Sequence, residues 1–292
     1  MEKIILFYRF APLRDPEATK LWQLSLARSL DLKGRVIVSA QGINGTLGGD
    51  INDLKEYVKQ TKKYPLFSDI VFKWSDGKRN DFPRLSVKVR SELVSFGVPD
   101  KLKVTADGIV GGGKRIKPEK LHQLVKEKGD QLVFVDGRNI REAAIGRFKN
   151  AVVFNVEHTR DFPAEIKNPK HSSLKDKTIV TYCTGGIRCE ILSKLMIDEG
   201  YKDVYQLDGG IVKYLDRYGD DGLWEGSLYV FDNRLRVNYS DHSQVIGECV
   251  HCGGKTADYV NCINVSCNEQ VLVCPDCSRR QKFSCSSCLA VN

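Results

Sequence analysis

The stretch TIVTYCTGGIRCE, residues 178–190, joins a buried β-strand to a helix through a short loop that carries a cysteine. The β-branched and apolar residues before Cys183 predict the strand, and the residues from Arg188 onward predict the helix. Gly185 and Gly186 give the loop backbone angles that are closed to other residues, so the chain can curl around the sulfur. We therefore expect backbone N–H groups to point at the sulfur of Cys183.

The same loop is predicted to hold Cys183 as a thiolate. The helix N-terminus adds partial positive charge and Arg188 adds a full positive charge at the rim, so the pKa of the thiol falls. We predict that Cys183 and Arg188 are catalytic residues. The loop residues that support the thiolate are Thr184, Gly185, Gly186 and Ile187. The alternative is a buried cysteine at a strand end that serves packing alone.

The size of the loop favours sulfur chemistry over phosphate chemistry. Protein tyrosine phosphatases have one more residue between their cysteine and arginine, which widens the loop for phosphate oxygens, whereas four residues separate Cys183 from Arg188 here. The tighter loop suits a single sulfur atom attached to Cys183. Cys189 follows directly, and it could resolve a sulfenate or persulfide on Cys183 or simply pack inside the helix.

The composition places the chain among ordinary globular proteins. It has 292 residues, enough for two or three domains, with 41% apolar and 28% charged residues. No run of about eighteen apolar residues is present, which excludes a membrane span, and the N-terminus lacks the apolar core of a signal peptide. We therefore expect a cytoplasmic protein whose ten cysteines are reduced rather than joined as disulfides.

The chain is expected to fold into three parts. Residues 1–113 follow the order strand, helix, strand, strand, helix, strand (βαββαβ), which is that of a ferredoxin-like sandwich. Residues 114–222 alternate strands with helices, which predicts an α/β domain with a parallel sheet covered on both faces. Residues 223–292 lose the helical periodicity and contain eight of the ten cysteines, which predicts a linker followed by a small cysteine-rich module.

The first of these parts is basic, with 19 Lys and Arg against 13 Asp and Glu. This surplus suits a polyanion such as RNA, although a solvated charged surface gives the same count. Lys88 and Arg90 alternate with apolar residues and so share one strand face, where they could grip RNA phosphates or simply meet solvent. Asn44 and Gly45 are expected to form a tight hairpin turn with left-handed backbone angles, and Asn44 could also contact a phosphate.

Four closely spaced cysteine pairs mark the C-terminal part. They are Cys249 and Cys252, Cys262 and Cys267, Cys274 and Cys277, and Cys285 and Cys288. Eight soft ligands suit two tetrahedral zinc sites, with an iron–sulfur cluster or free thiols as alternatives. We expect a cross-braced arrangement in which the first pair joins the third and the second joins the fourth. Sites closed by four thiolates leave no position for a substrate, so the zinc role is structural and His242 and His251 are bystanders.

The region around the cysteine loop resembles a rhodanese domain. The stretch VDGRNIREAAIGRFKNAVVFNV, residues 135–156, carries the motif residues Asp136, Arg138, Glu142 and Gly146-Arg147-Phe148. The cysteine loop follows this stretch, as it does in that family. The resemblance implies that Cys183 carries a persulfide and that Asp136 and Arg138 form a scaffold that holds the loop.

Three further stretches, in the same order along the chain, resemble the tRNA uridine hydroxylases. They are VSAQGINGTLGG (residues 38–49), FPRLSVKVRSELVSFG (82–97) and LWEGSLYVFDNR (223–234). The resemblance covers nearly the whole chain, with Gln41 standing where an acidic residue is expected in that family. It implies oxygen-dependent hydroxylation of wobble uridine 34, in the tRNA anticodon loop, to 5-hydroxyuridine, with Cys183 as the active cysteine.

Three functions are therefore compatible with the sequence. They are a tRNA-modifying oxygenase with molecular oxygen as co-substrate, a rhodanese-type sulfurtransferase with a persulfide on Cys183, and an RNA-binding module with a redox-sensing thiol. No flavin, haem or NAD motif is present, so we expect the thiolate or persulfide of Cys183 to add to C6 of uracil and make C5 nucleophilic. A sulfur-carrier or reductant protein would then be a partner. The motif order and the basic surplus favour the oxygenase.

Overall fold

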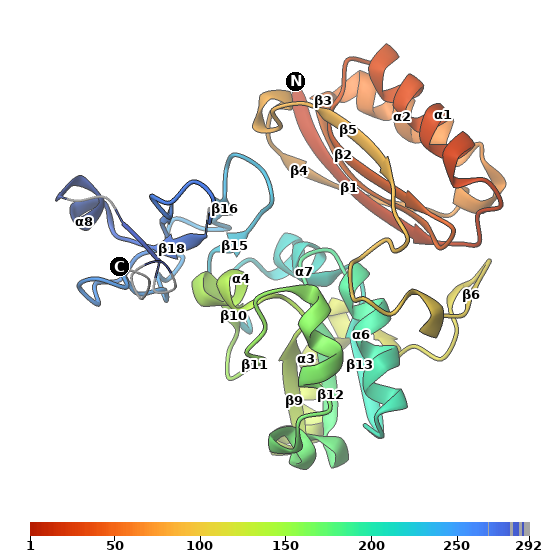
Figure 1. Cartoon of the computed structure of the whole chain (residues 1–292). Coiled ribbons are helices and arrows are strands. Elements are labelled where there is room, and N and C mark those ends of the chain that lie inside the picture. The colour runs from red at the N-terminus through yellow and green to blue at the C-terminus, as the bar shows by residue number, and fades with distance from the viewer. Residues whose placement is uncertain (268, 281–282, 286–287, 289–292) are drawn as a thin grey trace.

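The computed structural model describes residues 1–267, 269–280, 283–285 and 288 of the chain. Figure 1 shows an N-terminal sheet with two helices on one face, a second α/β unit beside its other face, and a C-terminal part that extends to one side. We refer to the first two as the N-terminal unit and the parallel-sheet unit. No helix among the described residues combines the length and apolar character needed to cross a bilayer.

The N-terminal unit is a five-stranded sheet in the order β4-β1-β3-β2-β5. Its elements are β1 Glu2–Phe10, α1 Pro16–Ser29, β2 Lys33–Ser39, β3 Gly42–Asp50, α2 Ile51–Lys62, β4 Val71–Asp76 and β5 Leu85–Val89. The predicted βαββαβ order is confirmed, and β5 extends it by one strand that runs parallel to β2. Both helices begin at an aspartate side chain that accepts from a backbone N–H in the first turn, Asp15 for α1 and Asp50 for α2.

The helices cover one face of this sheet and leave the other face to the parallel-sheet unit. Side chains alternate along a strand, so Phe7 and Leu47 pack under the helices while Tyr8 and Asn44 point the opposite way. The register puts Tyr8 opposite Asn44 and, two strands further along the sheet, Ile37 opposite Lys88. We call this second surface the open face of the sheet.

The turn between β2 and β3 lies at Ala40 and Gln41, four residues earlier than the predicted turn at Asn44 and Gly45. Ser39 pairs with Gly42, and Gly42 has a φ of +135° where a Cβ would lie 2.0 Å from the carbonyl oxygen of Arg9. Asn44 and Gly45 are regular strand residues of β3, so the expected left-handed hairpin at these positions is wrong. The glycine at 45 instead makes room for the Phe7 ring, whose Cζ would be 2.5 Å from a Cβ.

The parallel-sheet unit has five strands in the order β11-β9-β12-β13-β8, and every pairing is parallel, as predicted. Its elements are β8 Lys114–Ile116, α3 Pro118–Lys128, β9 Leu132–Asp136, α4 Ile140–Ile145, β10 Gly146–Phe148, β11 Val152–Val153, α5 Phe162–Glu165, β12 Thr178–Tyr182, α6 Ile187–Asp198, β13 Asp203–Leu207 and α7 Gly210–Tyr218. Two short strands, β6 Val104–Thr105 and β7 Gly108–Ile109, precede it.

Helices cover both faces of this sheet. In β12, Ile179 joins the apolar cluster of α6, whereas its neighbour Val180 joins the cluster of α3 and α7 on the opposite side. Both residues are fully buried, and β12 is the central strand of the sheet. The loop that holds Cys183 follows this strand.

The C-terminal part consists of short strand pairs and one short helix. Its elements are β14 Trp224–Gly226, β15 Leu228–Tyr229, β16 Arg236–Val237, β17 Tyr259–Asn261, β18 Gln270–Leu272 and α8 Pro275–Arg280. Strand β14 pairs with β10, which fastens this part to the parallel-sheet unit, and β15 pairs with β16 across a tight loop.

Candidate functional site

The loop after β12 wraps around the sulfur of Cys183. Gly186 has a φ of +100° and caps α6, and its N–H lies 3.2 Å from the Cys183 Sγ. A left-handed residue at this point turns the first amides of α6 toward the sulfur. Cys183 itself is fully buried, so its sulfur meets protein donors in place of bulk water.

The surroundings of Cys183 favour the thiolate. Burial raises the pKa of this thiol, but a hydrogen bond from the Cys189 thiol, the Arg188 guanidinium and the backbone N–H groups of both residues outweigh it and lower the pKa to about 5. Cys189 shows the opposite effect, since burial and the neighbouring Cys183 thiolate raise its pKa well above the ordinary value. At neutral pH the pair therefore consists of an anionic Cys183 and a protonated Cys189 that donates to it.

Arg188 is held by an ion pair inside the protein, and the expected position at the rim is wrong. Its Nη2 lies 2.8 Å from Oε2 of Glu142, its Nη1 contacts the other carboxylate oxygen, and only 8% of the residue is exposed. Glu142 belongs to α4, where it also closes a capping box with Asn139. The bidentate pair fixes the guanidinium beside the loop, where it also reaches the Thr184 hydroxyl at 3.3 Å.

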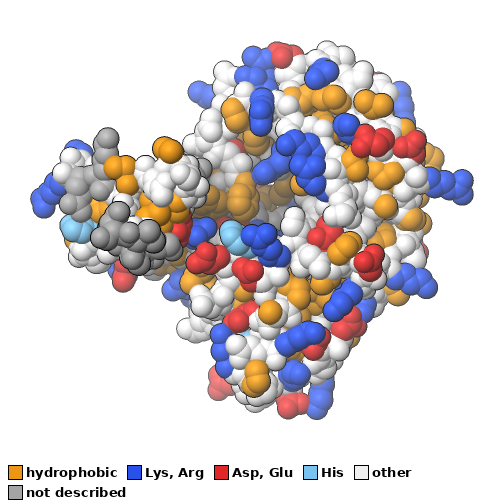
Figure 2. Space-filling view, viewed as in Figure 1, with side chains coloured by type: hydrophobic (Ala, Val, Ile, Leu, Met, Phe, Trp, Pro, Cys, Tyr) orange, Lys and Arg blue, Asp and Glu red, His pale blue; other side chains and the backbone are white. Residues whose placement is uncertain are grey.

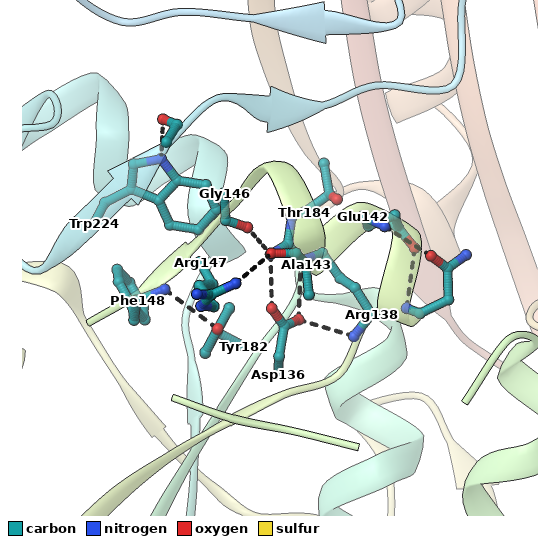
Figure 3. Close-up of polar contacts among 12 residues, drawn as sticks. Asp136, Arg138, Glu142, Ala143, Gly146, Arg147, Phe148, Tyr182, Thr184 and Trp224 are labelled. Carbon is teal, nitrogen blue, oxygen red and sulfur yellow. Dashed lines mark hydrogen bonds and ion pairs between the residues drawn. The ribbon is translucent and has the colours of Figure 1, made fainter. Parts of the chain in front are cut away.

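Asp136 and Arg138 form a second buried ion pair (Figure 3). The Arg138 Nε and Nη2 donate to the Asp136 carboxylate at 2.9 and 2.6 Å, and Nη2 also donates to the carbonyl oxygen of Gly146 at 2.5 Å. Both side chains are fully buried, and the guanidinium lies over the Trp224 ring. These contacts tie the end of β9 to β10 and β14, an arrangement suited to a scaffold.

The open face of the N-terminal sheet docks directly on the cysteine loop. Lys73 of β4 donates to the carbonyl oxygen of Gly185 at 2.8 Å, and the Tyr8 hydroxyl of β1 donates to Glu190 of α6 at 3.0 Å. A Cβ at Gly185 would lie 2.6 Å from a methyl carbon of Leu6. Burial lowers the pKa of Lys73 to about 8 against the opposing effect of the Cys183 thiolate.

A cleft of about 1030 Å³ lies between the open face and the loop. The cysteine loop and the start of α6 contribute Cys183, Thr184, Gly185, Ile187 and Arg188. The N-terminal unit contributes, among others, Tyr8, Arg35, Asn44, Thr46, Lys73, Arg84 and Lys88. Figure 2 shows a hollow at this place, with hydrophobic side chains in its depth and Lys and Arg side chains gathered at its rim. The structure thus brings Asn44 and Lys88 to the same cleft as Cys183. Arg90 follows the end of β5, donates to the carbonyl oxygen of Val89, and does not line the cleft.

The loop between β15 and β16 closes one side of the cleft. Arg234 donates to the backbone carbonyl oxygen of Asp76 at 2.5 Å, and the Asn233 N–H donates to that of Asp81 at 2.9 Å. Both acceptors belong to the N-terminal unit, so the C-terminal part reaches across and holds it. Gln41 lies outside the cleft lining, where its side chain contacts the backbone of Leu93 and Pro99.

The tail cysteines gather in two groups of four. One group contains Cys249, Cys252, Cys274 and Cys277; the other contains Cys262, Cys267, Cys285 and Cys288. In each group the sulfur atoms lie within 4.8 Å of one another, so each group could hold a metal ion. The predicted cross-braced pairing, first with third and second with fourth, is confirmed. Neither group includes His242 or His251.

Comparison with known proteins matches each part of the chain. Residues 2–93 match the UPF0176 acylphosphatase like domain, residues 117–217 the rhodanese-like domain, and residues 225–289 the rhodanase C-terminal model. A tRNA uridine(34) hydroxylase of Corynebacterium glutamicum (strain R) is 56% identical over 94% of this chain and 88% of its own length. A protein of the same name from Rhodococcus opacus (strain B4) is 57% identical over 96% of this chain and 98% of its own length. Another, from Corynebacterium kroppenstedtii, is 54% identical over 99% of this chain and 98% of its own length.

The chain belongs to the tRNA uridine(34) hydroxylase family. The resemblance drawn from the motifs is therefore confirmed, and so is the resemblance of the central part to a rhodanese domain.

Sequence reasoning about this family member missed the residues that join its parts. Lys73, Tyr8 and Arg234 were not singled out, although alternation along β1 and β4 places Tyr8 and Lys73 on the face opposite the helices. The alternation does not show which part of the chain covers this face. Arg234 lay within a motif that was recognised by resemblance alone.

The first prediction concerns the charge of Cys183. A thiolate absorbs ultraviolet light, so the absorbance of a Cys183→Ser variant is subtracted from that of the wild-type chain. The difference reports the Cys183 thiolate, because the tail thiolates contribute equally to both proteins. Because the pKa is lowered to about 5, this difference should be complete at pH 7 and fall as the pH drops through 5. A difference that appears only above about pH 8, the range of an ordinary thiol, would contradict the assignment.

Proposed function

We propose that this chain hydroxylates uridine 34, the wobble position of the tRNA anticodon loop, to 5-hydroxyuridine. The observation that carries the proposal is the Cys183 thiolate at the base of a cleft walled by a basic sheet face. Relatives 54–57% identical over nearly the whole chain are named for this reaction. We place the reaction in the cytoplasm, with tRNA as the macromolecular substrate.

The cleft suits a nucleotide that has left its stack. Its volume of about 1030 Å³ exceeds the space one nucleotide needs, which leaves room for the flanking phosphates. Arg35, Arg84 and Lys88 line the sheet side and supply positive charge for these phosphates. The bases of an anticodon loop are single-stranded and can be turned toward a protein at small cost.

The chemistry we propose begins with addition of the Cys183 thiolate to C6 of the uracil ring. The C5–C6 π electrons move onto C5 and O4, and C5 then bonds one atom of molecular oxygen, the co-substrate. Two electrons and two protons, supplied by a reductant protein, convert the other oxygen atom to water. Loss of the C5 proton and departure of the sulfur from C6 restore the ring as 5-hydroxyuridine and regenerate Cys183.

The residues around the sulfur would share this work. Arg188, fixed by Glu142, keeps positive charge beside Cys183 while the sulfur is anionic. Cys189 donates a hydrogen bond to the thiolate in the resting state, and its raised pKa makes it a weak nucleophile there. Asp136 and Arg138 act as scaffold. A persulfide on Cys183, the basis of a sulfurtransferase, is not favoured because the relatives that match nearly the whole chain are named for uridine hydroxylation.

We further propose that each cysteine group holds one zinc ion. Four thiolates within 4.8 Å of one another suit a tetrahedral, closed zinc site with no open position for substrate. The ions would fix the fold of the tail, whose described strands are short and whose core is small.

Replacing Cys183 by serine tests the role of the thiol. A serine hydroxyl is neutral at pH 7 and adds poorly to C6, so 5-hydroxyuridine at position 34 should fall by at least about 1000-fold in single-turnover assays. Nucleoside mass spectrometry of the substrate tRNA gives the readout, and an unchanged melting temperature shows that the variant is folded. Wild-type levels of product from Cys183→Ser would contradict the mechanism.

The basic face is tested by a matched pair of lysines. Lys88→Ala removes a cation from the cleft lining, whereas Lys126→Ala removes an exposed one from α3, outside that lining. We expect Lys88→Ala to weaken tRNA binding by about 2- to 5-fold and to lower the salt slope by about one, because one phosphate contact is lost. Equal effects of the two substitutions would show that the face does not bind the RNA.

Metal analysis tests the tail. The purified chain should contain two zinc ions, one for each group. Cys252→Ser and Cys267→Ser should each lower the content to about one, while Cys183→Ser leaves it unchanged. Bound iron with visible charge-transfer absorbance would overturn the zinc proposal. A zinc content that stays unchanged in both tail variants would also overturn it.

A further inference from the structure

An aromatic side chain stands exposed in the wall of the cleft at Phe231. More than half of this residue, 53%, is accessible, and it lines the cleft together with Cys183 and Arg188. The Arg188 guanidinium lies 5.9 Å from the centre of its ring, and Tyr229 supports the ring from another side in an edge contact. The exposed ring therefore lies beside the helix that begins at the cysteine loop.

The backbone that carries Phe231 is fixed by its neighbours. The Asp232 side chain is 3% exposed and accepts three hydrogen bonds from Arg234, two from its guanidinium and one from its backbone N–H. The Arg234 guanidinium also donates to the carbonyl oxygen of Asp76 in the N-terminal unit. Leu235 adopts a φ of +59°, which closes the tight loop. The backbone therefore holds the Phe231 ring in a fixed, solvent-exposed position. The exposed ring does not gain the free energy that an apolar side chain ordinarily gains on burial.

Other aromatic side chains that line the cleft are less available. Tyr8 is half-buried and donates to Glu190, Phe82 is 7% exposed, and Trp74 and Tyr239 are half-buried. Of the aromatic residues that the structure places in the lining, Phe231 alone is mostly open. A base that leaves its stack in the anticodon loop loses stacking that an open ring can replace.

We infer that Phe231 is the stacking platform for the pyrimidine base that Cys183 attacks. The inference rests on the proposed function and assigns the residue that holds the target base. The base lies flat on the open side of the ring, next to the loop that holds the thiolate. Any planar base satisfies such a contact, so Phe231 supplies affinity and orientation, while discrimination of uracil comes from other groups.

Substitution of Phe231 separates stacking from support of the fold. Phe231→Leu keeps an apolar side chain but removes the ring face, so kcat/KM for uridine 34 should fall by about 5- to 100-fold. Phe231→Tyr keeps the ring face and should stay within about 2-fold of wild type. Leu21→Ala, which trims an exposed apolar residue on α1, is the matched control and should have no effect. Equal activity of the leucine and tyrosine variants would overturn the inference. So would a loss of activity accompanied by a matching fall in melting temperature, because the substitution would then act on the fold.

Photo-crosslinking locates the base without relying on turnover. An anticodon stem–loop RNA with 5-iodouridine at position 34 is irradiated with the full chain, and the linked residue is identified by mass spectrometry. Linkage at Phe231 supports the inference, and linkage elsewhere, with wild-type hydroxylation intact, overturns it while leaving the proposed function standing. Absence of any crosslink, with wild-type hydroxylation intact, also overturns the inference alone. Failure of the wild-type chain to hydroxylate uridine 34 would overturn the proposed function and this inference with it.

Discussion

Burial of an anionic sulfur at Cys183 is the constraint on which the rest of the site depends. A charge removed from water is unfavourable unless donors and opposite charge replace its hydration. Here the left-handed Gly186, the first amides of α6, the Cys189 thiol and the Arg188 guanidinium provide that replacement. Arg188 is itself a buried charge, and Glu142 balances it. Loss of Glu142 would leave that guanidinium unpaired, at a cost of about 3–5 kcal/mol.

The site belongs to the contact between units rather than to the parallel-sheet unit alone. Lys73 and Tyr8 reach the cysteine loop and its helix from the open face of the N-terminal sheet, and Gly185 has no side chain to keep that face away. The loop around Arg234 ties the C-terminal part to the N-terminal unit. The rhodanese-like loop thereby forms the base of a cleft with one basic wall.

Local sequence signals predicted much of this structure. The β-branched run before Cys183, the glycine pair and the cysteine spacings indicated a buried strand, the wrapped loop and the four cysteine pairs, because each depends on residues close in sequence. Which pairs share a group depends on the fold of the tail, and the expected cross-braced arrangement was not fixed by the spacings. Glu142 is 46 residues from Arg188, and no local pattern says that the two meet. The turn at Ala40 and Gln41 was misplaced because Asn44-Gly45 carries a strong turn signal, which sheet pairing overrides. Lys73 and Phe231 depend on how the parts dock, which periodicity does not encode.

The most direct test of the account is hydrogen exchange at C5 of uridine 34 in the absence of oxygen. Addition of the Cys183 sulfur to C6 makes C5 basic, so the wild-type chain should catalyse uptake of deuterium from heavy water at that carbon before any oxidation takes place. Mass spectrometry of the recovered nucleoside should show the heavier uridine with the wild-type chain and not with Cys183→Ser. A chain that forms 5-hydroxyuridine in air but never exchanges this hydrogen without oxygen would contradict attack by the thiolate.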